Sequence, residues 1–108
     1  MKFMFDKQGY PLIDIEYEYH VLADFLRGDI QGSLFGVNEF ITACNDVSSG
    51  NSLEWEGTGN AHTVTIRKEG VHIFNEYTGE ELDIPTIDEF KHYLEGWKAL
   101  LLTKNKME

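Results

Sequence analysis

The sequence has little cysteine and no long hydrophobic run, and each shortage excludes a class of protein. One cysteine among 108 residues, Cys44, leaves no second thiol for an intrachain disulfide. No apolar run approaches the roughly 20 residues of a membrane-spanning helix. The start of the chain turns polar after five residues, so we expect no signal peptide and a cytoplasmic protein. We also expect one domain over residues 1–108, because two would each be too small to bury a core.

Positive charge is also scarce. Nine Lys and Arg residues stand against 19 Asp and Glu residues, which gives a formal net charge of −10. Such a chain repels phosphate, and it has no stripe of Lys or Arg to overcome the repulsion. The balance therefore argues against direct binding of nucleic acid and favours a cationic partner. No membrane partner is expected, because no apolar run is long enough to span a bilayer.

Aromatic and β-branched residues alternate with polar residues in several short segments, which is typical of half-buried antiparallel strands. Five segments are predicted as strands: residues 2–6, 13–19, 53–56, 61–68 and 71–77. Three segments are predicted as helices: residues 20–27, a second helix from Asn38 through Val47, and a third from Thr86 through Leu101. A strand is the alternative for the first half of 20–27. This order predicts an α+β fold, an antiparallel sheet of about five strands with helices packed on one face. The other face is left for solvent or a partner.

Local signals add detail to this prediction. Glu69-Gly70 is predicted as a two-residue hairpin loop, which would pair Ile66 with Ile73. Thr86 followed by Glu89 predicts a capping box at the start of the last helix. The apolar face of that helix is formed by Phe90, Tyr93, Leu94, Trp97 and Leu101. Gly96 weakens the helix interior, and we expect it to mark close packing on the sheet.

No catalytic, cofactor-binding or metal-binding constellation is complete, so we expect a protein that is not an enzyme. Cys44 lies on the apolar side of a predicted helix, which indicates a buried structural thiol. The four histidines lack metal-binding spacing, and His62 and His72 fall on opposite faces of the predicted sheet. The glycine-rich segment 28–36 lacks the Lys-Ser/Thr of a phosphate-binding loop and is predicted as a plain loop.

The acidic residues are distributed unevenly along the chain. No Lys or Arg occurs between Gly28 and Ile66 or between Glu69 and Phe90. Aromatic residues interleave with the acids, and aromatic anchors ringed by carboxylates can bind a basic protein surface. The predicted partner-binding residues are Asp14, Glu16, Glu18, Glu54, Trp55, Glu56, Tyr77, Glu80, Glu81 and Asp83.

Two alternatives remain open for these residues. Charge runs are usually solvated faces, and Trp and Tyr side chains are usually core residues. The acids at positions 14–18 can also protect a sheet edge against pairing. Phe74 falls on the face opposite Ile73, so it is either an exposed anchor or is covered by a second layer.

Two stretches carry a resemblance to known proteins: LEWEGTGNAHTVTIRKEGVHI (53–73) and IDEFKHYLEGW (87–97). Both are similar to the small acidic bacterial YacL-like proteins, and they resemble immunity proteins of contact-dependent growth inhibition systems. The resemblance implies a cytoplasmic α+β protein that binds and neutralises a cognate toxin domain, commonly a nuclease. The alternative is a non-catalytic housekeeping adaptor or binding domain of the YacL-like family with another protein partner.

Overall fold

The computed structural model describes residues 1–107, with side chains through residue 104. The strands are β1 (Lys2–Phe5), β2 (Pro11–Asp14), β3 (Glu54–Thr58), β4 (His62–Arg67), β5 (Gly70–Asn75) and β6 (Glu81–Ile84). The helices are α1 (His20–Phe25), α2 (Leu34–Ser48) and α3 (Ile87–Met107), with a 3-10 turn at Tyr17–Tyr19 and a π-helical turn at Leu26–Ile30.

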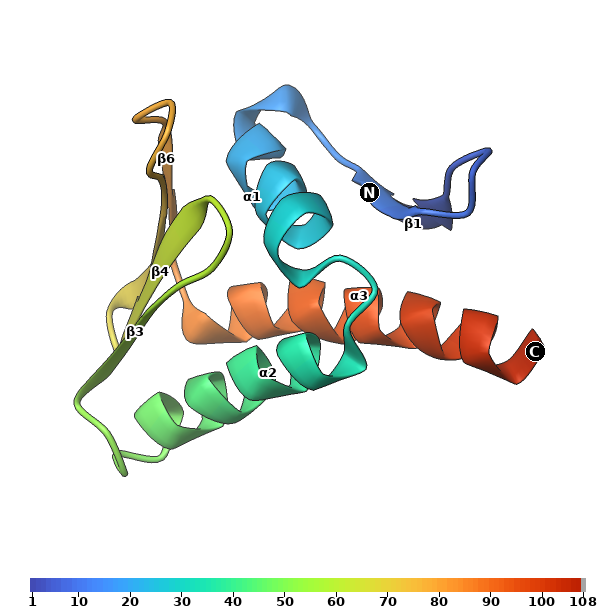
Figure 1. Cartoon of the computed structure of the whole chain (residues 1–108). Helices are drawn as coiled ribbons and strands as arrows, with labels where there is room; N and C mark the ends of the chain where they lie inside the picture. Colours follow the sequence, from blue (N-terminus) through green and yellow to red (C-terminus); the bar gives the residue numbers. More distant parts are fainter. Residues whose placement is uncertain (108) are drawn as a thin grey trace.

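The strands form two separate antiparallel sheets, so the chain is a mixture of helix and sheet. One sheet has four strands in the order β3-β4-β5-β6, and the other is the two-stranded hairpin β1-β2. The helices lie on one face of the four-stranded sheet, while the hairpin lies over the C-terminal half of α3 (Figure 1). The prediction of one sheet of about five strands is therefore wrong in its strand arrangement.

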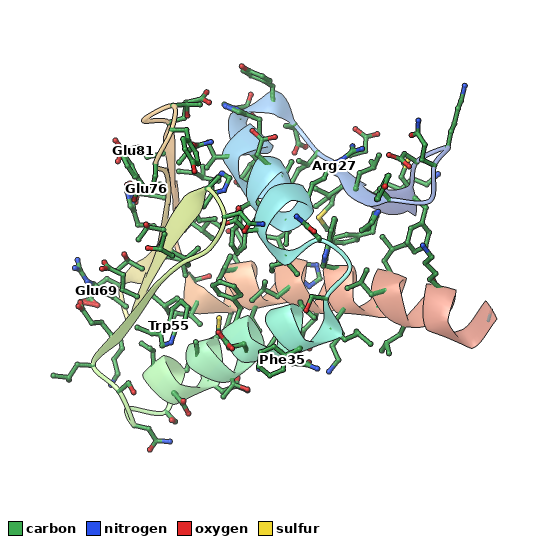
Figure 2. The ribbon with its side chains drawn as sticks, in the orientation of Figure 1. Arg27, Phe35, Trp55, Glu69, Glu76 and Glu81 are labelled. Atoms are coloured by element: carbon green, nitrogen blue, oxygen red, sulfur yellow. The ribbon has the colours of Figure 1, made fainter. Side chains whose placement is uncertain are left out.

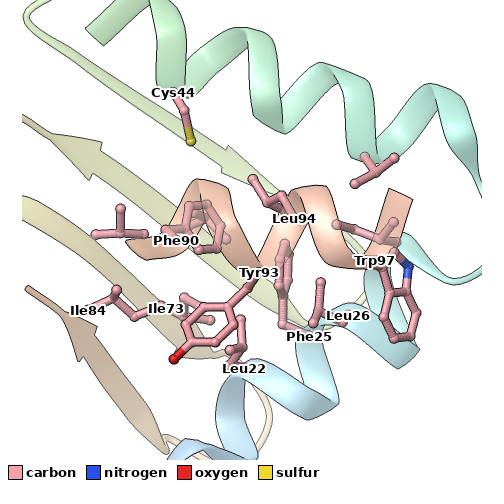
Figure 3. Close-up of a cluster of buried hydrophobic side chains, with 14 of the residues drawn as sticks. Leu22, Phe25, Leu26, Cys44, Ile73, Ile84, Phe90, Tyr93, Leu94 and Trp97 are labelled. Atoms are coloured by element: carbon pink, nitrogen blue, oxygen red, sulfur yellow. The ribbon is translucent and has the colours of Figure 1, made fainter. Parts of the chain in front are cut away.

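The core lies between the four-stranded sheet and the helices (Figure 3). Every second residue along the central strands points to this inner face, and its buried apolar residues are Val64, Ile66, Val71, Ile73 and Ile84. The predicted apolar face of the last helix is confirmed, since its five residues are all buried. Trp97 is fully buried, and its indole N–H donates a hydrogen bond to the backbone oxygen of Gln31 at 2.9 Å.

One half of the predicted capping box is present, and Gly96 does mark close packing, although against the two-stranded hairpin rather than the four-stranded sheet. The hydroxyl of Thr86 accepts a hydrogen bond from the backbone N–H of Glu89 at 3.0 Å, as a helix cap requires. Gly96 packs so closely against β1 that a Cβ atom there would collide with the ring of Phe3. The close contact therefore holds the hairpin β1-β2 on α3.

The first two helices depart from the prediction. The first helix passes Gly28 through the π-helical turn, so that glycine does not end it. The second helix begins well before Asn38, because the Ser33 hydroxyl caps it by accepting from the Gly36 N–H at 2.9 Å. The predicted 28–36 loop is thus largely helical.

The strand predictions need three corrections. Strand 13–19 ends at Asp14, because β1 pairs only as far as Lys2 with Asp14 and no strand within residues 1–107 lies beside the residues that follow. Ile66 pairs with Val71 rather than with Ile73, because the hairpin loop is Lys68-Glu69. A sixth strand, β6, was not predicted.

Among residues 1–107, no helix is long and apolar enough to cross a membrane.

Candidate functional site

The four-stranded sheet turns one face away from the helices, and within residues 1–107 no helix lies on it (Figure 1). Strand residues alternate between the two faces, so the residues between the buried ones point outward. The outward residues on β3 to β6 are Glu54, Glu56, Thr58, Thr63, Thr65, Arg67, His72, Phe74, Glu81 and Asp83. We call these ten residues the outer sheet face.

Four of the predicted partner-binding acids meet on the outer sheet face. Glu54 and Glu56 come from β3, whereas Glu81 and Asp83 come from β6, and all four are exposed. The pairing register sets Glu56, Thr65, His72 and Asp83 in one row across the sheet. Figure 2 shows Glu81 on the side of the sheet away from the helices. Segments far apart in the sequence therefore form one acidic surface.

Hydrogen bonds hold several of these carboxylates in place. The Thr65 hydroxyl donates to Glu56 at 3.0 Å. Arg67 lies 2.8 Å from Glu54, and it is the one Lys or Arg on the outer sheet face. His72 stands between two acids, with Nδ1 at 2.7 Å from Asp83 and Nε2 at 3.2 Å from Glu81. Four carboxylates against one guanidinium leave the face negative.

Phe74, on the inner strand β5, belongs to the outer sheet face. Its neighbours across the ladders are Thr63 and Glu81. The ring is half-buried, and no helix of the described chain covers it. An aromatic ring surrounded by hydroxyls and carboxylates offers apolar contact to a partner at the centre of a polar surface.

The tip between β5 and β6 extends the acidic surface toward the start of α1. Tyr77 is 82% exposed on this tip. Glu80 lies 2.6 Å from Nε2 of His20, whose ring stacks on the 79% exposed Tyr17 with centroids 4.4 Å apart. The hydrogen bond with Glu80 raises the pKa of His20 above its ordinary value and lowers that of the Glu80 carboxyl. Glu16, also exposed, precedes this stack.

The structure places the remaining predicted residues elsewhere. Glu18 lies in the 3-10 turn rather than on a strand, and Asp14 lies at the end of β2 in the other sheet. Trp55 points to the inner side of β3, where its ring meets Phe40 of α2 edge to face with centroids 5.2 Å apart (Figure 2). Trp55 is therefore separated from the acids that flank it in the sequence.

A buried pair that the sequence reasoning missed joins the sheet to the helices. The Asp29 carboxylate accepts from the backbone N–H of His62 at 3.0 Å and from that of Ala61 at 3.2 Å. Nδ1 of His62 lies 3.0 Å from the same carboxylate, and both side chains are 2% exposed. Nε2 of His62 has no hydrogen-bond partner among the described residues. The sequence carries no signal for this pair, since its members are 33 residues apart.

Cys44 is a packing residue of the core. Cys44 is fully buried, and burial raises the pKa of its thiol to about 12, which keeps it protonated at neutral pH. His62 and His72 do lie on opposite faces of the sheet, as predicted. Among the described residues, no three His, Cys, Asp or Glu side chains are placed to hold a metal ion.

The model of the Uncharacterised protein family (UPF0231) matches residues 1–100 of the chain. No curated protein and no solved structure matches.

Proposed function

The chain belongs to the Uncharacterised protein family (UPF0231), and we propose that it acts as a non-catalytic binding protein whose outer sheet face takes up a cationic surface of another protein. The observation that carries the proposal is the meeting of Glu54, Glu56, Glu81 and Asp83 around the half-buried Phe74 on an uncovered sheet face.

The chemistry of this face fits a basic protein. Carboxylates gathered on one surface attract a positively charged partner from a distance and raise its association rate. After contact, Phe74 and the exposed Tyr77 supply apolar area that can be buried at the centre and edge of the interface. The Thr hydroxyls between the acids add hydrogen-bonding groups. A face of this kind needs no catalytic group.

The partner class follows from the sequence resemblance. We propose a cognate toxin domain, commonly a nuclease, whose nucleic-acid-binding surface is cationic. The chain would then act in the cytoplasm as an immunity protein. A housekeeping adaptor that uses the same acidic face is the alternative, and the activity of the bound partner distinguishes the two.

Affinity capture with a matched pair of variants tests the acidic face. Glu81→Lys with Asp83→Lys reverses two charges on the face, whereas Asp24→Lys with Glu95→Lys reverses two on exposed helix positions. We expect wild type and the helix variant to retain a cationic protein from bacterial lysate at about 50 mM salt and to lose most of it at about 200 mM. The sheet variant should bind the purified partner at least roughly tenfold more weakly.

The outcomes separate the possibilities. Equal retention on all three proteins, or none on wild type, would overturn the proposal. If the purified partner is a nuclease that loses its activity in an equimolar complex, the immunity function is supported. A partner that stays fully active in the complex favours the adaptor.

A further inference from the structure

Strand β3 is an edge of the four-stranded sheet. Among residues 1–107 it has a neighbouring strand, β4, on one side and no strand on the other. In an antiparallel ladder, every second residue turns its backbone N–H and C=O away from the neighbouring strand. The Gly59 N–H donates to the His62 oxygen at 3.0 Å, which makes that pair hydrogen-bonded. Counting back along the register, Gly57 and Trp55 bond to β4.

The three remaining residues of β3 therefore present free backbone groups. These residues are Glu54, Glu56 and Thr58. A row of unpaired N–H and C=O groups is a template for another strand. The exposed Leu53, 91% accessible to solvent, comes directly before this row.

A groove runs beside the same edge, between β3 and α2. Its volume is about 350 Å³, and its lining includes Phe35, Glu39, Thr42, Ala43, Asp46 and Trp55. Phe35 is 78% exposed although it is a large apolar side chain. Figure 2 shows Phe35 on α2 and Trp55 on the side of β3 that faces this helix. The groove thus offers apolar contact on the inner side of the free edge.

The charge around this edge selects the occupant. Glu54 and Glu56 belong to the outer sheet face beside this edge. Glu39 and Asp46 line the groove, and no Lys or Arg lines the groove. A second copy of this chain, paired edge to edge, would bring the glutamates of both copies together, which is unfavourable. A segment that carries positive charge meets no such repulsion.

We propose that the β3 edge binds an extended, basic segment of a partner protein, which adds to the sheet as a fifth strand. Side chains of an added strand alternate between two sides. On one side, Lys or Arg of the segment would lie beside Glu54 and Glu56, and on the other, apolar side chains would enter the groove against Trp55. The inference rests on the proposed function, because it says how the cationic partner is held.

A short peptide that alternates lysine and valine is the probe. Its controls are two versions of the same peptide, one N-methylated at every lysine and the other at every valine, so that each keeps the charge and loses the donors of one strand edge. We expect the version methylated on the edge that faces β3 to bind at least roughly tenfold more weakly than the unmodified peptide, and the other version to bind about as well as it. Hydrogen exchange of the Glu54, Glu56 and Thr58 amides should slow in the complex, while Trp55 and Gly57, already bonded, change little.

Two variants at one position test the edge in the protein. Glu56→Pro removes an outward N–H and one acid from β3, whereas Glu56→Gln removes the acid alone and keeps the N–H. We expect Glu56→Pro to bind the peptide roughly tenfold more weakly than Glu56→Gln, and equal binding would contradict strand addition. Circular dichroism establishes that each variant is folded, and Thr58→Pro, which removes another outward N–H of β3, replaces Glu56→Pro if that variant is unfolded.

The failures of the two proposals are distinguishable. If the plain peptide and both N-methylated peptides bind equally, with no new amide protection on β3, charge alone holds the peptide. That result would overturn strand addition. The acidic face would survive that result. Failure of all three peptides to bind at about 50 mM salt, together with no cationic protein retained in the capture experiment, would overturn both proposals.

Discussion

Replacing Asp29 should show how strongly one carboxylate holds the sheet against the helices. Asp29→Ala leaves the backbone N–H groups of Ala61 and His62, and Nδ1 of the His62 ring, without their common acceptor. All lie in a nearly dry region, since both side chains are 2% exposed. A buried hydrogen-bonding group left without its partner costs about 1 to 3 kcal/mol, and three such groups share this carboxylate. We therefore expect the free energy of unfolding to fall by at least about 3 kcal/mol.

Asp29→Asn should cost less, about 1 to 2 kcal/mol. The amide oxygen can still accept from the His62 N–H, and the amide nitrogen can donate to Nδ1 if the imidazole proton moves to Nε2. Urea unfolding followed by tryptophan fluorescence measures both losses, and amide exchange at Ala61 and His62 reports the local opening. A loss below about 1 kcal/mol for Asp29→Ala, with exchange at both amides unchanged, would refute the reasoning.

Three further predictions concern other contacts. Gly96→Ala should lower the free energy of unfolding by about 1 to 2 kcal/mol in the same urea assay, because displacing the Phe3 ring outweighs a helix gain of about 1 kcal/mol; Phe3→Leu should reduce the loss, and a stabilised Gly96→Ala would contradict the packing argument. Cys44, buried with a pKa of about 12, should not react with a thiol reagent at neutral pH until urea unfolds the chain, and rapid labelling of the native protein would contradict this. His20 has a pKa raised above 6.5 and Glu80 one lowered below 4.5, so their pair stabilises the fold most between those pH values, and its contribution is lost as pH rises through the raised pKa; NMR titration of Glu80→Gln should return the His20 pKa toward its ordinary value, and an unmoved pKa would remove Glu80 as the cause.

Much of the fold could be predicted because local periodicity carries it. Strands such as β4 alternate buried and half-buried residues along their length, and the last helix repeats apolar residues at helical spacing with a cap at Thr86. The segment 15–19 alternates equally well and yet is no strand, since no strand of the described chain pairs with it. Residues 81–84 alternate over too short a stretch to predict a strand. They form β6 because they pair with β5.

The candidate site divides in the same way. The acids were predictable from composition and charge runs, and four of them were predicted without any sign that they meet. Trp55 shows the limit of sequence proximity, because neighbours in a strand point to opposite faces and its ring therefore contacts α2 instead of the acids. Whether these residues bind a partner stays a prediction.

The sequence by itself determined the acidic character, the presence of helices and strands, and the apolar face of the last helix, because these depend on residue type and on spacing within one segment. Only the tertiary structure decided which acids share the outer sheet face, that β3 is an edge, and that Asp29 meets His62. These are contacts between residues far apart in the chain, and strand order and register set them. No local pattern encodes such contacts, since each arises only when the whole core packs.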